Sequence, residues 1–165
     1  MKWRWAELAN YGKGQGKKVG VMSRPLIGLH TFVGIGALFG GVAALLNPYE
    51  PLGMPVEALE YSPFDNYLIP GIILLTIVGL GSIISALMLY SGSRFRGCVS
   101  AIFSWALVIW IVVQCLMLRT IHVLHIIFLI IGLTEVILST ATMLRHQLFP
   151  VNVIIRIFRE KNLYP

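Results

Sequence analysis

The chain has 165 residues, of which 57% are hydrophobic and only 12% are charged, and its mean hydropathy is +0.81. Because about a quarter of the residues in a typical soluble domain are charged, this composition excludes an ordinary soluble protein and indicates one surrounded by lipid. The formal net charge of +6 favours attraction to anionic lipid headgroups over nucleic-acid binding, since the basic residues are arranged as in membrane proteins.

The first 24 residues form a basic, polar segment ahead of any long apolar run. Within it, the sequence GKGQGKKVG at residues 12–20 superficially resembles a phosphate-binding loop. That motif requires Gly at position 11 and Ser or Thr at position 18, where this chain has Tyr11 and Lys18. The segment therefore lacks an ATP-binding signature.

Long apolar runs occupy most of the remaining chain. They span residues 25–46, 68–90, 98–118 and 123–144. Each is close to the ~20 residues that a helix needs to cross a hydrocarbon layer of ~30 Å. The second and third connections are short, so successive helices should be antiparallel. The sequence predicts an all-α polytopic membrane protein, a single domain over residues 1–165 built as an up-down bundle of four transmembrane helices.

The positions of the basic residues predict the orientation of this bundle. Twelve of the thirteen lie before the first run, between the second and third, or after the fourth, and only Arg119 lies on the opposite side. Basic loops stay in the cytoplasm. We therefore expect cytoplasmic tails at residues 1–24 and 145–165, an external loop at residues 47–67, and a location in the cell membrane.

The expected external loop, NPYEPLGMPVEALEYSPFDNY, contains four prolines and four acidic residues. Loops of this length without regular structure are uncommon unless they are functional or mobile. A docking surface or lid is one interpretation, and a simple spacer is the other. Pro55 suits the first position of a short helix that reaches Tyr61. The acidic residues lack the alternate spacing of a compact calcium loop.

Small and polar residues recur at helical spacing within the apolar runs. Such stripes contain Gly34 and Gly41 in the first run, Ser82 in the second and Gly132 in the fourth. Between helices in lipid, close packing of small residues and polar contacts decides which faces meet. We therefore predict that these four residues lie where helices pack together.

Glu135 is the acidic residue well inside an apolar run, and an ionisable group within the membrane is by default a functional-site hypothesis. The helical rise from the ends of the runs places His30 in the same half of the membrane. With Gln114, these residues form the predicted intramembrane polar site. One interpretation is a proton- or cation-responsive pair or part of a ligand pocket. The other is a neutral, hydrogen-bonded carboxylic acid that fixes the helix register.

A second polar cluster, Arg119, His122 and His125, is expected near the external face. Two histidines without a third ligand are a weak signal for a metal, and no two facing histidines match in depth as haem ligands require. We therefore expect no metal and no cofactor. Cys98 and Cys115 are about 25 Å apart along one helix and do not form a disulfide with each other.

The tail after residue 150 contains the sequence VNVIIRIFREK. As a helix it places Val151, Ile154, Ile155 and Phe158 on one face and charged residues on the other. This pattern predicts a short amphipathic helix at the membrane interface.

No complete catalytic, metal or nucleotide signature occurs in the sequence, so we do not expect an enzyme. The first hypothesis is an accessory or regulatory subunit that docks onto a second copy or a larger membrane partner through its glycine-rich helix faces and acidic external loop. The second is a small oligomeric transporter or channel that uses Glu135 and His30. An enzyme acting on lipid or quinone through Arg119, His122 and His125 ranks last, because no acid-base constellation is complete.

Overall fold

Four long helices make up most of the structure, which is a computed structural model and describes residues 23–93 and 95–145. All four are long and apolar enough to cross a membrane, and every regular element in the described ranges is helical. They are α2 (Ser23–Leu46), the continuous helix α3–η3–α4 (Leu68–Ile73, Leu74–Leu80 and Gly81–Ser91), α5 (Arg96–Leu118) and α6 (Val123–Arg145).

The predicted all-helical architecture with four long apolar helices is confirmed, and each helix begins and ends within two residues of its predicted run. This agreement has a simple cause, because the runs are bounded by charged residues, prolines and glycines that do not continue an apolar helix. The predicted amphipathic helix after residue 150 and most of both predicted tails lie outside the described residues.

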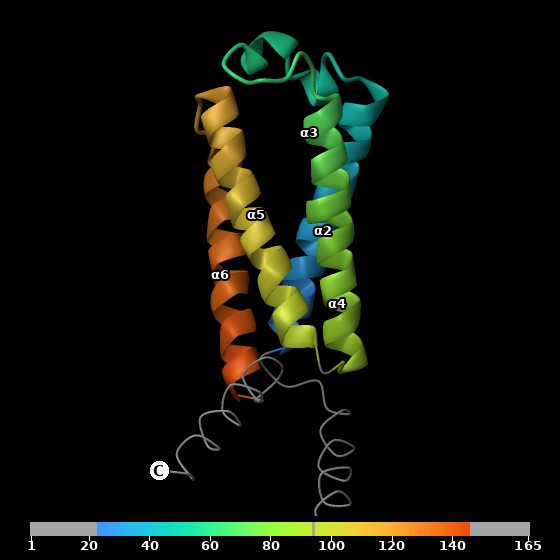
Figure 1. Ribbon diagram of the computed structural model, residues 1–165, viewed down its shortest axis with the longest axis vertical. Coiled ribbons are helices and arrows are strands. Elements are labelled where there is room, and N and C mark those ends of the chain that lie inside the picture. The colour runs from blue at the N-terminus through green and yellow to red at the C-terminus, as the bar shows by residue number, and fades with distance from the viewer. Residues whose placement is uncertain (1–22, 94, 146–165) are drawn as a thin grey trace, which may run out of the picture.

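The helices form two pairs, which Figure 1 shows on opposite sides of the view. α5 packs along α6, and α2 packs along α3–η3–α4. Residues 47–67 and the connection between α5 and α6 lie at the same end of the bundle, called the loop end here. At the other end, called the far end, α2 and α5 begin and α4 and α6 end. The two pairs approach each other near the far end and separate toward the loop end.

Glycine permits the closest contacts between helices. A Cβ atom on Gly41 would lie 2.9 Å from the backbone nitrogen of Leu75, and one on Gly132 would lie 2.9 Å from Cγ2 of Val108. A Cβ on Gly34 would lie 2.6 Å from a side chain of the second long helix. These distances are shorter than carbon atoms tolerate. The pairs α2 with α3–η3–α4 and α5 with α6 therefore pack tightly because these positions lack side chains.

The middle of the second long helix, η3, is π-helical over Leu74–Leu80. It lies where α2 comes close to this helix, since Gly41 faces the backbone of Leu75. Within η3, Val78 is buried in the interior between the two helix pairs. π-Helical turns are rare and often occur near functional sites.

The loop of residues 47–67 contains two short 3-10 helices, η1 (Pro51–Gly53) and η2 (Val56–Leu59). The second follows Pro55, where the sequence predicted a short helix, and it ends two residues before Tyr61.

Hydrogen bonds and burial fasten this loop to the bundle. The backbone N–H of Tyr67 donates to the carbonyl oxygen of Pro48 at 2.8 Å, and its hydroxyl donates to that of Pro55 at 3.2 Å. Burial and the nearby Glu57 carboxylate raise the pKa of Tyr67, so this hydroxyl keeps its proton and remains a donor. Leu59 is buried beside Met117 of α5. The loop is therefore attached to both helix pairs.

Apolar side chains cross the middle of the bundle between the two ends. Val33 of α2, Val78 of η3, and Leu107 and Ile111 of α5 are all buried there. These four residues are called the apolar layer. It separates two regions of different chemistry, a polar half toward the far end and a cavity toward the loop end.

Candidate functional site

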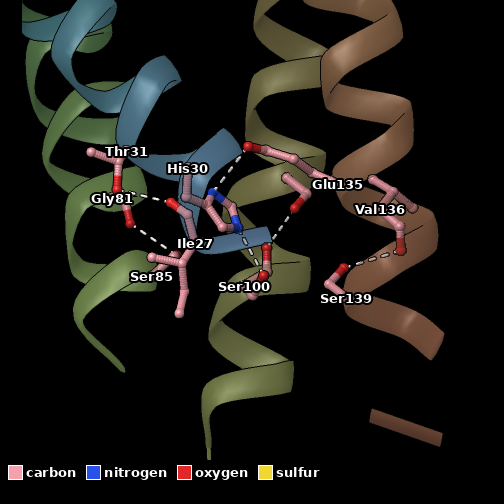
Figure 2. Close-up of polar contacts among 10 residues, drawn as sticks. Ile27, His30, Thr31, Gly81, Ser85, Ser100, Glu135, Val136 and Ser139 are labelled. Atoms are coloured by element: carbon pink, nitrogen blue, oxygen red, sulfur yellow. Dashed lines mark hydrogen bonds and ion pairs between the residues drawn. The ribbon is translucent and has the colours of Figure 1, made fainter. Parts of the chain in front are cut away.

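His30 and Glu135 meet in the half of the bundle next to the far end (Figure 2). Atom Nδ1 of His30 lies 3.4 Å from Oε1 of Glu135, and both side chains are fully buried. His30 is seven residues from the start of α2 and Glu135 is ten residues from the end of α6, or about 10 Å and 15 Å along their helices. Their depths match because α2 and α6 are antiparallel neighbours.

The second nitrogen of the same imidazole contacts a third helix. Nε2 of His30 lies 2.7 Å from Oγ of Ser100 in α5, and Figure 2 shows the ring between Ser100 and Glu135. His30 of α2 thus contacts both helices of the other pair, α5 and α6. A contact of this kind fixes the rotation of α2, α5 and α6 relative to one another.

Other polar side chains are buried around this centre. Ser139 and Thr142 follow Glu135 along one face of α6, and Arg96 precedes Ser100 by one turn of α5. Ser23, Ser82, Ser85 and Ser104 are fully buried as well. Ser85 and Ser104 donate to carbonyl oxygens of their own helices. Small hydroxyl groups thus line the half of the bundle between His30 and the far end.

Several of these buried atoms make no hydrogen bond within the described part of the chain. They are Oγ of Ser23 and Ser82, Nδ1 of His30, Nε and Nη1 of Arg96, both carboxyl oxygens of Glu135 and Oγ1 of Thr142. Buried polar groups in proteins are normally paired with protein atoms or ordered water. The far half of the bundle therefore has the chemistry to hold water molecules or a small polar ligand, whereas the apolar layer does not.

The two groups of the pair lie close together, but the 3.4 Å contact between them is not a hydrogen bond in this structure. An imidazole nitrogen and a carboxyl oxygen that face each other can share one proton, which either atom can carry. Ser100 can donate to or accept from Nε2, so either tautomer of His30 has a partner. Both interpretations of the sequence stay open, a proton-responsive pair and a neutral, hydrogen-bonded carboxylic acid that fixes the helix register, and the second lacks its hydrogen bond among the described residues.

The structure does not bring Gln114 to this pair. Gln114 is fourteen residues beyond Ser100 in α5, or about 21 Å along the helix, and it lies beyond the apolar layer toward the loop end. Helical spacing predicted that Gln114 lies on the inward face of α5. It did not show which residues of the other helices lie at the same depth.

The second predicted cluster divides into two contacts. The backbone N–H of His122 donates to Nδ1 of His125 at 3.1 Å, and their ring centroids are 5.7 Å apart. Arg119 instead places its guanidinium 4.2 Å from the ring centre of Tyr61 in the loop, a cation–π contact. Across residues 23–93 and 95–145, no three His, Cys, Asp or Glu side chains gather as metal ligands.

The predicted packing residues Gly34, Gly41, Ser82 and Gly132 are all buried between the chain's own helices. Their close contacts are with η3, α4 and α5, as the distances at Gly34, Gly41 and Gly132 show. These faces are therefore used inside the bundle.

No protein-family model, curated protein or solved structure matches this chain. The function has to be argued from the geometry.

Two residues of interest were missed at the sequence level. Arg96 was counted among the basic loop residues, yet only 2% of it is exposed. Its position four residues before Ser100 was the available signal, since residues four apart share a helix face. Trp110 lies on the same helical stripe of the sequence as Ser100 and Gln114, which indicated its burial, but the sequence did not show that its indole N–H lacks a hydrogen-bond partner among the described residues.

Proposed function

We propose that this protein is an accessory or regulatory subunit of a membrane assembly, without enzymatic activity of its own. The loop of residues 47–67 is its docking surface, either for a larger membrane protein or for a second copy. The observation that supports this is a loop that is fastened to the bundle and still exposes large apolar side chains. Tyr49 is 63% exposed and Leu52 is 65% exposed. Exposed aromatic and apolar groups that cluster on a surface often mark a protein interface.

The charge of the loop indicates the chemistry of the partner. Glu50, Glu57, Glu60 and Asp65 are all exposed. Complementary charge increases the rate and specificity of association. A partner with a basic, partly apolar surface outside the membrane fits this loop best.

The proposal includes an orientation. The tails lie in the cytoplasm, where their basic residues contact anionic headgroups, and the loop end lies outside the cell membrane. The glycine-rich helix faces are buried inside the bundle, so docking in this proposal relies on the loop.

A site-specific crosslink tests the docking surface. A photoreactive residue in place of Tyr49 should give a discrete crosslinked product in native membranes. Tyr90 is the matched control, because it is a tyrosine of similar exposure, at 74%, but lies next to the far end. Products of the same size from both positions, or none from either together with a monomeric purified protein, would refute the proposed surface.

A second candidate is a small oligomeric transporter, and the buried contact between His30 and Glu135 favours it. Ionisable groups inside membranes often mark proton or ion pathways. Within one chain the apolar layer lies between the polar half and the loop end. A continuous polar path across the membrane therefore requires an oligomer or a conformational change.

Flux into liposomes tests this candidate. Proton or cation flux through reconstituted wild-type protein should be abolished by Glu135→Gln and retained by Glu60→Gln, which removes an exposed carboxylate of the loop. If the wild-type protein shows no flux under any proton or cation gradient, the transporter hypothesis is wrong and the pair has a structural or regulatory role.

A further inference from the structure

A cavity of about 570 Å3 lies between the two helix pairs, in the half of the bundle next to the loop end. Its walls come from all four long helices, and Leu52 and Leu59 of the loop line it at the loop end. Ligand sites in proteins typically measure about 300–1,000 Å3. The volume is therefore that of a site for one small molecule.

The walls determine which molecules fit. The described residues that line the cavity include no Asp, Glu, Lys or Arg, and most are aliphatic or aromatic. The polar ones are Tyr67, Trp110, Gln114, His122 and His125. The hydroxyl of Tyr67 is already bonded to Pro55. An occupant must therefore be uncharged and largely apolar, with a few polar atoms on the side that faces α5.

Trp110 indicates which polar group an occupant of the cavity must carry. Only 7% of this residue is exposed, and its Nε1 makes no hydrogen bond to any described residue. An indole N–H only donates, and a buried donor without an acceptor is unfavourable. Gln114 lines the cavity one helical turn away, with a Cβ separation of about 5–6 Å. The wall of α5 thus presents two donor groups one turn apart.

The depth of Trp110 in the membrane distinguishes a diacyl lipid from a neutral ring on an apolar tail. Trp110 is eight residues from the end of α5 at Leu118, or about 12 Å inside the loop end. The polar headgroup region of a bilayer lies outside the hydrocarbon core of about 30 Å. A diacyl lipid would therefore place only its chains beside Trp110. A neutral ring with carbonyl groups on an apolar tail can place its oxygens at this depth.

We infer that this cavity binds a neutral, carbonyl-bearing ring on an apolar tail, the chemistry of a prenylated quinone. The ring lies beside Trp110 and Phe128, with its carbonyl oxygens accepting from Nε1 of Trp110 and the amide of Gln114. The inference does not depend on the pair formed by His30 and Glu135, and the cavity shares Leu52 with the proposed docking surface.

The test uses the purified full-length protein in phosphatidylcholine nanodiscs and two probes with the same tail. One is a benzoquinone with a decyl tail, and the other is decylbenzene, which lacks carbonyl oxygens. The thermal unfolding midpoint is followed as each probe is added. A ligand that binds the folded state raises the midpoint until the site is saturated. We expect a saturable rise with the quinone and none with decylbenzene.

Variants locate the binding. Gly36 lines the cavity, and a Cβ added there would meet only Cζ of Phe128, at 3.9 Å. Gly36→Leu should occupy the part of the cavity beside Phe128, where the ring is expected, and should weaken or abolish the saturable rise. Gly28→Leu is the matched control on the same helix, because a Cβ there meets nothing within 4 Å. It should bind as the wild type does. Trp110→Phe keeps an aromatic ring but removes the donor, and should require about three- to tenfold more quinone.

Three results would overturn the inference. They are no saturable rise in the wild type, an equal rise with decylbenzene that Trp110→Phe leaves unchanged, and normal binding by Gly36→Leu. The second result would identify the cavity as a site for lipid chains alone. If Gly36→Leu does not fold, the comparison of probes and the Trp110→Phe variant still decide the question.

Discussion

His30 joins the two helix pairs through polar contacts, since one of its ring nitrogens faces Glu135 and the other faces Ser100. The apolar side chains around it slide over one another at small energetic cost, whereas these two contacts require one particular depth and rotation. We therefore expect the polar contacts of His30 to contribute more to a single defined packing than to total stability.

Ser100 and Ser104 allow a matched test of this expectation. Both are fully buried in α5, but Ser100 contacts His30, whereas Ser104 donates to the carbonyl oxygen of Ser100 within its own helix. Ser100→Ala should lower the free energy of unfolding by about 0.5–1.5 kcal/mol, because the imidazole loses a partner from another helix. Ser104→Ala should change it by less than about 0.5 kcal/mol.

Unfolding by SDS in mixed micelles measures both variants. If Ser104→Ala is as destabilising as Ser100→Ala, the contact with His30 has no special role, and loss of a buried hydroxyl explains both effects.

For single residues, the sequence predicted the position along one helix but not the contacts with residues of other helices. Glu135 and His30 were recognisable because an ionisable group in an apolar run is rare, and the helical rise gave their depths. Ser100 as a partner, the burial of Arg96 and the stacking of Arg119 on Tyr61 depend on rotations of helices about their axes. Those rotations are set by neighbours from distant parts of the chain.

Among the elements, α2 and η3 show how far local sequence determines structure. The bounds of the four long helices follow from apolar length alone, and the small residues that face inward follow from helical spacing. The π-helical turns of η3 do not, because nothing in the residues LLTIVGL distinguishes them from an α-helical segment. Their position opposite Gly41 indicates that packing against α2 determines them.

Two glycines of α2 provide a test of this packing. In Gly41→Ala the new Cβ would meet the backbone of Leu75 at 2.9 Å, which α2 can relieve only by moving away from η3. We expect a loss of about 1–3 kcal/mol in the free energy of unfolding. Gly28→Ala meets nothing within 4 Å and should instead stabilise the helix by about 0.5–1 kcal/mol.

Thermal or SDS unfolding compares the two variants, and circular dichroism confirms that helix content is retained. A Gly41→Ala protein as stable as Gly28→Ala would mean that α2 and η3 are not held at this distance in the membrane.

For the whole molecule, the arrangement of basic residues predicts which end of the bundle faces the cytoplasm. In a variant with Cys98 and Cys115 replaced by Ser, a single cysteine at Glu60 should react with an impermeant maleimide added to intact cells. A single cysteine at Ser91 should react only after the cells are permeabilised. Both positions are exposed and lie at opposite ends of the bundle, so the pair of variants reports the orientation directly. Labelling of Ser91→Cys in intact cells would reverse the proposed topology.

The division of the bundle by the apolar layer was not predictable from the sequence, because it depends on how far the two helix pairs separate toward the loop end. Helical spacing predicted inward faces for every helix. It did not predict that polar side chains gather in one half while a cavity occupies the other.

Val33, Val78, Leu107 and Ile111 belong to one buried apolar cluster between these halves. A molecule bound near Trp110 and a proton on Glu135 would lie on opposite sides of this cluster, while α5 carries Trp110 and also Ser100, the partner of His30. We expect a bulkier or smaller side chain at Leu107, which belongs to this cluster and also lines the cavity, to change how strongly the two sites influence each other through α5.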